Sequence, residues 1–187
     1  MNSQNPKSHQ RQLARARIAE LSPEYRKSAD ATICTKLTQL PAYQSAQTIA
    51  SYQPLPDEVD LTQFHQFALS AGKTLAFPVT SNNSMQFFAP KGSLIKNLFQ
   101  IPEPNPKTSQ LIHPDQIDLI ILPCRAFDPA TKHRLGRGAG YYDRFLSASK
   151  NSKTHLIIVA YHTQSTPNLP HDPHDVPAHQ VITELPL

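Results

Sequence analysis

The residues with the clearest chemical potential lie in one short segment, "HRLGRGAGYYDRFL", residues 133–146. It holds three of the five glycines in the chain, with three arginines, two adjacent tyrosines and one aspartate. Glycine lets backbone N–H groups approach an anion closely, and arginine can bind phosphate oxygens in bidentate fashion. The carboxylate of Asp143 could hold a divalent cation that bridges phosphates. The segment therefore predicts a site for a phosphorylated ligand.

The spacing of these glycines differs from that of two common nucleotide-binding motifs. No Gly-Lys-Ser/Thr follows them, as a Walker A loop requires. Gly136, Gly138 and Gly140 are evenly spaced, unlike the G-x-G-x-x-G fingerprint. The alternative interpretation is a tight turn between a strand and a helix, with solvated arginines. The clustering of glycine with arginine favours a functional anion site over that turn.

The elements around this segment alternate between strands and helices. Strands are expected at residues 73–80, 84–90, 117–123, 154–162 and 180–184, with another that begins at residue 48. Helices are expected at residues 8–21, 22–40, 60–71, 94–99 and 140–149, and residues 101–114 are expected to form a proline-broken surface loop. This order predicts one α/β domain over residues 1–187, with a mostly parallel central sheet and helices on both faces. Ligands bind such sheets beyond the carboxyl ends of the strands, where the glycine segment is expected.

The composition narrows the class of ligand. The net charge is +4 with a pI near 9.1, and the positive charge concentrates in the N-terminal segment and in residues 125–144. Charge held at two places favours a compact anion over a nucleic acid, so no nucleic-acid partner is expected. No apolar run approaches the roughly 18 residues of a membrane span. The two cysteines are expected to be reduced thiols of a cytoplasmic protein. A mitochondrial transit peptide is the alternative for the basic start, although Pro6 argues against it.

Several motifs together resemble one family of enzymes. The run "RLGRGAGYYDRFL", preceded by "DLIILP" and "AFD", resembles the signature of the 5-formyltetrahydrofolate cyclo-ligase family. Weaker matches follow in the family's order: Lys7 and Arg11 before "LSPE", then "SYQPLPDEVD", "IPEP" and the pair His174–Asp175. The resemblance extends from Lys7 to Glu184. It implies a ligase that uses ATP and Mg²⁺ to convert 5-formyltetrahydrofolate to 5,10-methenyltetrahydrofolate, releasing ADP and phosphate.

The resemblance also implies which residues bind ATP. The basic N-terminal helix, within residues 1–22, would contribute to this site, and Asp143 would bind Mg²⁺. The implied ATP-binding residues are Lys7, Arg11, Arg134, Leu135, Gly136, Arg137, Gly138, Ala139, Gly140, Tyr141, Tyr142 and Asp143. Arg15 continues the basic face of the helix, and a solvated role is equally compatible with its position.

The catalytic and folate-binding residues are implied in the same way. Arg137 would stabilise the phosphoryl group during transfer, and Tyr141 would stack on the folate. Tyr142 would then pack in the core, because adjacent aromatic residues at a helix start point to different faces. Glu58 would accept hydrogen bonds from the pterin, with Gln53 as a further substrate contact. The alternative for Glu58 is an ordinary acid at a helix start.

The second metal ligand departs from the family pattern. Where the family has a metal-binding aspartate this chain has His179, and imidazole is a poor ligand for Mg²⁺. Asp175 is the alternative second ligand. This departure keeps open a degenerate member that binds folate or nucleotide without turnover, and a basic RNA-binding module is another alternative. A zinc or nickel site at His171, Asp172, His174, Asp175 and His179 is less favoured than a plain surface loop.

Overall fold

The computed structural model describes residues 6–81, 84–97, 100–149 and 153–187. Within these ranges, seven strands form one sheet in the order β11-β10-β7-β1-β2-β3-β6. Their bounds are β1 Thr48–Ala50, β2 Thr74–Ser81, β3 Ser84–Ala89, β6 Gln110–Ile112, β7 Leu119–Pro123, β10 His155–Val159 and β11 Gln180–Ile182. The first five strands in this order are parallel, and β3 is antiparallel to both β2 and β6. The prediction of a mostly parallel α/β fold is confirmed.

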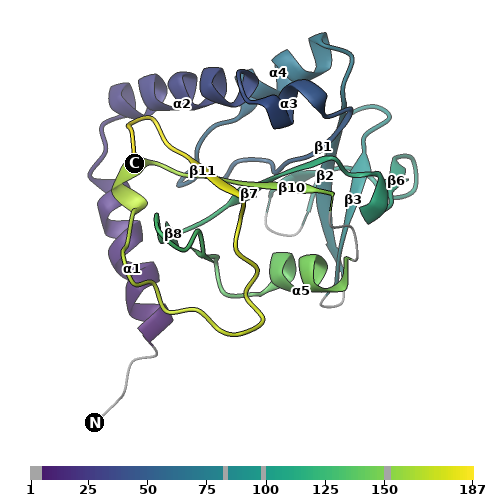
Figure 1. Cartoon of the computed structure of the whole chain (residues 1–187). Coiled ribbons are helices and arrows are strands. Elements are labelled where there is room, and N and C mark those ends of the chain that lie inside the picture. The colour runs from purple at the N-terminus through teal and green to yellow at the C-terminus, as the bar shows by residue number, and fades with distance from the viewer. Residues whose placement is uncertain (1–5, 82–83, 98–99, 150–152) are drawn as a thin grey trace.

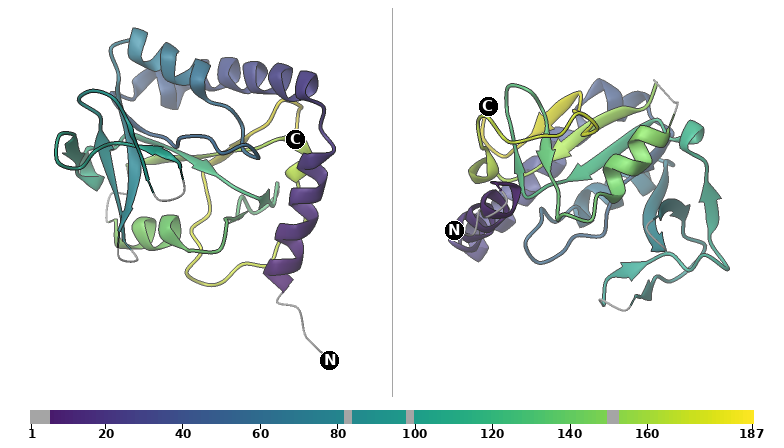
Figure 2. Two further views of the ribbon diagram at one scale, coloured as in Figure 1. Left: turned by 180° about the vertical axis from the view of Figure 1, so that it is seen from behind. Right: turned by 90° about the horizontal axis from the view of Figure 1, so that it is seen from below.

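The helices cover both faces of this sheet (Figure 1). Three of them lie on one face: α2 Pro23–Thr38, α3 Pro41–Ser45 and α4 Thr62–Ser70. The opposite face carries α5, Tyr141–Ala148. The first helix, α1 Pro6–Ala19, stands at the side of the sheet beside the short 3₁₀ helix η2, His162–Gln164 (Figure 2). A second 3₁₀ helix, η1, spans Pro114–Gln116.

The core consists of two main layers, one on each face of the sheet. On β7, Leu119 and Ile121 belong to the layer under α2 and α4, while Ile120 and Leu122 belong to the layer that α5 covers. This division explains why "LIIL" is apolar without a break, since both faces of a central parallel strand are buried. Burial on both faces therefore fixes β7 within the sheet, and with it the start of the loop that follows Pro123.

Two helix starts follow from local sequence. The side chain of Ser22 accepts a hydrogen bond from the Tyr25 N–H at 3.1 Å, and Pro23 occupies the first turn of α2. The residue before α5 is Gly140, whose φ of 68° is left-handed. L residues rarely adopt this φ, so the entry into α5 favours glycine.

The structure corrects two predictions in the middle of the chain. Within the predicted helix at 94–99, β4 Ile95–Lys96 pairs antiparallel with β5 Pro102–Glu103, and residues 98 and 99 lie outside the described ranges. The predicted loop at 101–114 contains both β5 and β6. A helix of six residues is too short to be stable without packing against other elements. Here the side-chain oxygen of Asn97 accepts a hydrogen bond from the Ile101 N–H at 3.1 Å and closes a turn between β4 and β5 instead.

None of the helices in the described part of the chain is long and apolar enough to cross a membrane.

Candidate functional site

The glycine segment lies beyond the carboxyl end of β7, where it was expected. A small hairpin intervenes, in which β8 Ala126–Phe127 pairs antiparallel with β9 Arg134–Leu135. The chain then passes through the three glycines into α5. Because β9 is anchored by β8, the glycine segment starts from a buried strand rather than from a flexible loop.

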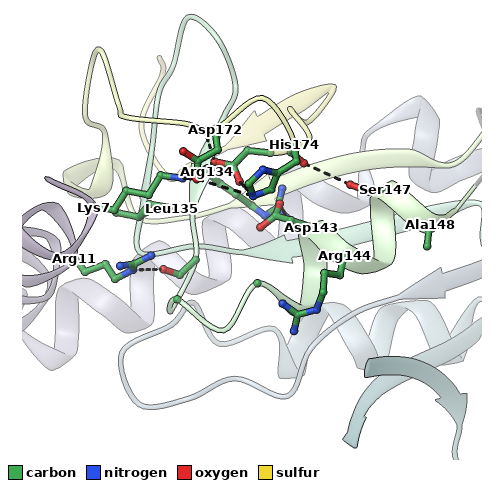
Figure 3. A pocket seen from close by; sticks show the side chains of 14 residues that line it. Lys7, Arg11, Arg134, Leu135, Asp143, Arg144, Ser147, Ala148, Asp172 and His174 are labelled. Atoms are coloured by element: carbon green, nitrogen blue, oxygen red, sulfur yellow. Dashed lines mark hydrogen bonds and ion pairs between the residues drawn. The ribbon is translucent and has the colours of Figure 1, made fainter. Parts of the chain in front are cut away.

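Two cavities meet at this segment. One, the basic pocket, has a volume of about 560 Å³ (Figure 3). Its walls come from α1, the glycine segment, α5 and the C-terminal tail. The lining residues are Lys7, Arg11, Arg134, Leu135, Gly136, Gly138, Gly140, Asp143, Arg144, Ser147, Ala148, Asp172, His174 and Asp175. Four of these are lysine or arginine and three are aspartate, so the lining is net positive, and Arg11 and Arg144 are cations that a polyanion could contact.

Helix α1 is joined to the glycine segment by Arg11. Its Nε donates a hydrogen bond to the Gly136 carbonyl at 2.9 Å. A Cβ atom at Gly138 would lie 3.4 Å from Cζ of Arg11, and Gly138 has a φ of 110° that L residues rarely adopt. The φ of Gly138 therefore favours glycine at this position, while an added Cβ atom would make only an ordinary van der Waals contact with Arg11.

Lys7 reaches across the basic pocket to the C-terminal tail. Its Nζ lies 2.7 Å from Oδ2 of both Asp172 and Asp175. Partial burial lowers the pKa of Lys7, but the hydrogen bonds and charges of these two aspartates outweigh it, so the pKa is raised. Lys7 is therefore a cation held at the mouth of the pocket by two carboxylates.

The two cavities share a wall that contains a buried ion pair. Nη2 of Arg134 lies 2.7 Å from Oδ1 of Asp143, and Nη1 donates to the Val176 carbonyl at 3.0 Å. The Arg134 side chain is only 3% exposed. The pair fixes the start of α5 against β9, and it presents Asp143 to both cavities.

The second cavity, the apolar pocket, has a volume of about 540 Å³. It opens between the end of β1, the strands β2 to β5 and the start of α5. Its walls include Tyr52, Gln53, Leu55, Glu58, Pro78, Met85, Ile101, Pro102, Pro123, Cys124, Arg137, Ala139, Tyr141 and Tyr142, with the shared Arg134, Gly136, Gly140 and Asp143. The structure thus brings Gln53, Glu58 and Tyr141 into one cavity. Its size and apolar lining suit a flat heterocycle.

Charged groups gather at one end of the apolar pocket. Asp57 forms ion pairs with Arg125 and with Arg137, the latter at 3.2 Å. Partial burial raises the pKa of Asp57, but the two arginines outweigh it and the pKa lies below its usual value. Nη1 of Arg137 also lies 3.6 Å from Oε1 of Glu58. Burial raises the pKa of Glu58, against the opposing effect of the Leu55 N–H and Arg137.

The two tyrosines differ in their surroundings. The Tyr142 ring packs edge-on to Phe87, and burial raises the pKa of its hydroxyl, which has no hydrogen-bond partner among the described residues. The Tyr141 ring lies under the guanidinium of Arg144, 5.1 Å from its Cζ. Tyr142 therefore packs in the core beneath the apolar pocket, and both rings contribute to its lining.

The histidine-rich tail separates into different environments. Asp172, His174 and Asp175 could offer ligand atoms within 4.8 Å of one another, but Lys7 already pairs with both aspartates. His171 stacks on His133, with ring centroids 3.9 Å apart. The structure does not bring all five tail residues considered for zinc or nickel into one cluster.

His179, the departure from the family pattern, is bound into the sheet. Its Nδ1 accepts the Leu156 N–H at 2.9 Å, and its own N–H donates to the Leu156 carbonyl. The ring stacks on His155 at the amino end of β10. His179 lines neither the basic nor the apolar pocket. The substitution therefore leaves the walls of both cavities unchanged.

Sequence reasoning missed several residues of the site. Arg144 lines the basic pocket. It directly follows Asp143 in the glycine segment, so its position in that motif could have identified it as a binding residue. Asp172 precedes the recognised His174–Asp175 pair. Asp57 and Arg125 are 68 positions apart, and no local pattern connects them.

Comparisons with known proteins agree with this architecture. The model of the 5-formyltetrahydrofolate cyclo-ligase family matches residues 3–184. The 5-formyltetrahydrofolate cyclo-ligase of Escherichia coli is 28% identical over 176 residues, covering 91% of this chain and 96% of that protein. The mouse protein of the same name is 27% identical, covering 90% of this chain and 88% of its own.

Two solved structures have the same fold. The 5,10-methenyltetrahydrofolate synthetase of Aquifex aeolicus, solved by NMR, superposes with a TM-score of 0.83 at 32% identity, covering 96% of this chain and 90% of that one. The Mycoplasma pneumoniae synthetase has a TM-score of 0.78 at 24% identity, covering 97% and 100%, which supports the fold alone. The family model, the relatives and the fold lead to one conclusion: the chain belongs to the 5-formyltetrahydrofolate cyclo-ligase family, a family of ligases.

Proposed function

We propose that this protein uses ATP to convert 5-formyltetrahydrofolate to 5,10-methenyltetrahydrofolate, with release of ADP and phosphate. The observation that carries the proposal is the pair of adjoining cavities. One is basic, the other is largely apolar with a buried acid, and the glycine segment forms the wall between them. A triphosphate in the first and a folate in the second would meet at that wall.

The basic pocket would bind the triphosphate. Arg11 and Arg134 supply positive charge, and the N–H groups of the glycine segment and of the start of α5 can donate to phosphate oxygens. Lys7 would exchange Asp172 and Asp175 for phosphate when the nucleotide enters. Catalysis of phosphoryl transfer depends mainly on such positioning and charge neutralisation.

The reaction would take place in two steps at the shared wall. The formyl oxygen attacks the γ-phosphorus, and the bond between that phosphorus and the ADP oxygen breaks. N10 of the folate then attacks the formyl carbon, the ring closes and phosphate leaves. Arg137 would neutralise charge on the phosphoryl group in transit, because its side chain lines the apolar pocket next to the shared Gly136 and is half-exposed.

The apolar pocket would hold the folate. Glu58 is buried at its end, and its carboxylate can accept hydrogen bonds from the aminopyrimidine edge of the pterin. The Tyr141 ring and the neutral amide of Gln53 also line this pocket. Together these residues would orient the formyl group toward Arg137.

A magnesium ion fits part of the predicted donor set. Asp143 is a carboxylate on the wall between the cavities, with the oxygen ligands that Mg²⁺ prefers. Asp175 remains the second candidate ligand, and each carboxylate has one oxygen on a cation: Oδ1 of Asp143 on Arg134 and Oδ2 of Asp175 on Lys7. Mg²⁺ held by Asp143 would supply further positive charge to the transferring phosphoryl group.

The remaining parts of the proposal concern the organisation and location of the protein. We take residues 1–187 as one cyclo-ligase domain, whose segment 1–22 contributes to the ATP site through Lys7 and Arg11. We place the protein in the cytoplasm, because Cys34 and Cys124 are both buried free thiols. The substrates are small molecules, and the cations line cavities rather than an extended track.

The test is an assay with purified protein. The near-ultraviolet absorbance of the methenyl product is expected to rise only when ATP, Mg²⁺ and 5-formyltetrahydrofolate are all present. The variant Arg11→Met is expected to raise the KM for ATP about tenfold, because a charged hydrogen bond near phosphate contributes roughly 1.5–3 kcal/mol. Arg15→Met is the matched control, since Arg15 lies on the same helix, exposed and outside both cavities.

Two outcomes would contradict the proposal. The first is folded protein that gives no product across a series of divalent cations. If isothermal titration then shows that such protein still binds ATP or folate, a binding protein without turnover replaces the proposed enzyme. The second is equal loss of activity in Arg11→Met and Arg15→Met, which would remove the basic pocket from the mechanism.

A further inference from the structure

Four charged side chains form a continuous series of ion pairs between the end of β7 and the apolar pocket. Arg125 binds Oδ2 of Asp57 through Nη1. Oδ1 of Asp57 lies 3.2 Å from Nη1 of Arg137, and the same nitrogen lies 3.6 Å from Oε1 of Glu58. Each oxygen of Asp57 therefore serves a different arginine.

The two arginines in this series of ion pairs, Arg125 and Arg137, differ sharply in burial. The side chain of Arg125 is 8% exposed, whereas that of Arg137 is 52% exposed. A buried guanidinium needs a partner, because an unpaired charge in the interior costs several kcal/mol. The partner of Arg125 is Asp57, and this ion pair holds Oδ2 of the Asp57 carboxylate in place.

The backbone of Arg125 is also fixed at both ends. Its N–H donates to the Leu135 carbonyl at 2.7 Å, and its carbonyl accepts a hydrogen bond from Nε2 of Gln164 at 3.1 Å. Arg125 thus lies between β7 and β8, and its backbone is tied to Leu135 of β9 and to Gln164 of η2.

Loss of the Arg125 guanidinium would change how Asp57 binds Arg137. A carboxylate with both oxygens available pairs with arginine in a bidentate fork, which is stronger than a single contact. Asp57 would then hold Arg137 more tightly and compete with both Glu58 and a transferring phosphoryl group. With Arg125 in place, only one oxygen of Asp57 faces Arg137.

On the basis of the proposed function, we propose that Arg125 is a positioning residue for the reaction. It holds one oxygen of Asp57 and thereby keeps Arg137 in the lining of the apolar pocket, shared with Glu58 and able to meet the phosphoryl group. Arg125 touches neither substrate in this arrangement. It acts through Asp57, and its effect is expected on the rate of chemistry rather than on ATP binding.

The decisive experiment combines three variants in the turnover assay. Arg125→Met keeps most of the side-chain volume and is expected to lower kcat on the order of tenfold, the scale of a misplaced catalytic group. The KM for ATP is expected to stay within twofold, because Lys7, Arg11 and Arg134 are unchanged. Arg125→Lys keeps a cation near Asp57 and is expected to retain more activity than Arg125→Met.

The double variant Arg125→Met/Asp57→Asn distinguishes positioning from a structural role. A neutral amide at position 57 cannot capture Arg137, so kcat is expected to recover to within about threefold of the wild type. A merely structural role predicts that the double variant is as impaired as Arg125→Met or more so, and this result would overturn the proposal. Thermal unfolding followed by circular dichroism would establish that each variant is folded.

The control for loss of a partly buried cation is Lys73→Leu. Lys73 donates to the Gln44 and Ala46 carbonyls at the other end of the sheet and lines neither cavity. Wild-type activity in Arg125→Met would also overturn the inference while leaving the proposed function intact. Wild-type protein without turnover would refute the proposed function itself, so the two failures remain separate.

Discussion

At the scale of single residues, burial of the acid Glu58 has a cost in stability that depends on pH. Glu58 is only 7% exposed at the side chain, and burial raises its pKa against the opposing effect of the Leu55 N–H and Arg137. An acid whose pKa is raised on folding binds more protons in the native state than in the unfolded chain. Stability is therefore lost as the pH rises through the raised pKa.

This cost leads to the first prediction, for Glu58→Gln. Gln is neutral at every pH and similar in size, so the variant is expected to have a higher Tm than the wild type at pH 7. The difference is expected to shrink as the pH falls toward 4.5, the ordinary pKa of a glutamate. Thermal unfolding across this pH range measures it.

The same substitution is expected to impair the proposed reaction. Replacing the carboxylate removes charged hydrogen bonds to the pterin, so the KM for the folate is expected to rise about tenfold or more. The KM for ATP should change little, because Glu58 lines only the apolar pocket of the two. A higher KM for ATP with an unchanged folate KM would contradict the assignment of Glu58.

At the scale of elements, the glycine segment couples α1 to α5. Gly138 has a φ of 110° and a close neighbour in Arg11. Gly136 has no positive φ, and a Cβ atom added there would meet no heavy atom within 4 Å. The two glycines are two residues apart in the same segment. They therefore form a matched pair for testing backbone strain.

The second prediction uses this pair. Gly138→Ala is expected to destabilise the fold by about 1–3 kcal/mol, the cost of a strained backbone, and to raise the KM for ATP because relief of that strain would move the lining of the basic pocket. Gly136→Ala is expected to change both quantities only slightly. Chemical unfolding and ATP-dependent kinetics measure the two effects, and equal effects of both substitutions would contradict the role given to Gly138.

At the scale of the whole molecule, the packing of α4 against the sheet depends on a neutral histidine. His65 on α4 lies 2.8 Å, through Nε2, from Oγ of Ser51, and its ring is edge-on to Phe77. Burial lowers the pKa of His65 to about 4, although Asp60 opposes the shift. The unfolded chain protonates this histidine near pH 6.5, but the folded protein does so only near pH 4.

The third prediction concerns acid stability. A histidine with a depressed pKa contributes stability that is complete above pH 6.5 and is lost as the pH falls toward 4. Between pH 6.5 and pH 5 the wild type is expected to lose on the order of 2 kcal/mol from this group, at about 1.4 kcal/mol per pH unit. Urea unfolding at both pH values measures the loss.

The control for this prediction is His65→Gln. The variant is expected to be less stable than the wild type at pH 7, because it loses the ring contacts with Phe64 and Phe77. Its stability should depend less on pH between 6.5 and 5 than that of the wild type. The same pH dependence in both proteins would show that other groups govern acid unfolding.

The type of fold and the chemistry of the glycine segment could be predicted from the amino-acid sequence alone. Continuous apolar runs such as "LIIL" on β7 predict buried parallel strands, since such runs reflect burial on both faces. The clustered glycines predict a close approach of the backbone to an anion, which stays a prediction, and the positive φ values of Gly138 and Gly140 explain why glycine is favoured there. These properties are local, so a short stretch of residues carries them.

Which distant residues lie together in a cavity depends on the tertiary structure. Lys7 meets Asp172 and Asp175, more than 160 positions away, and Arg125 meets Asp57 across 68 positions. The tertiary structure also placed His179 in the sheet, away from the cavity walls, and paired Ile95 with Glu103 where a helix was expected. Such contacts depend on sheet order and on the sum of many packing interactions, and no local pattern of residue types encodes them.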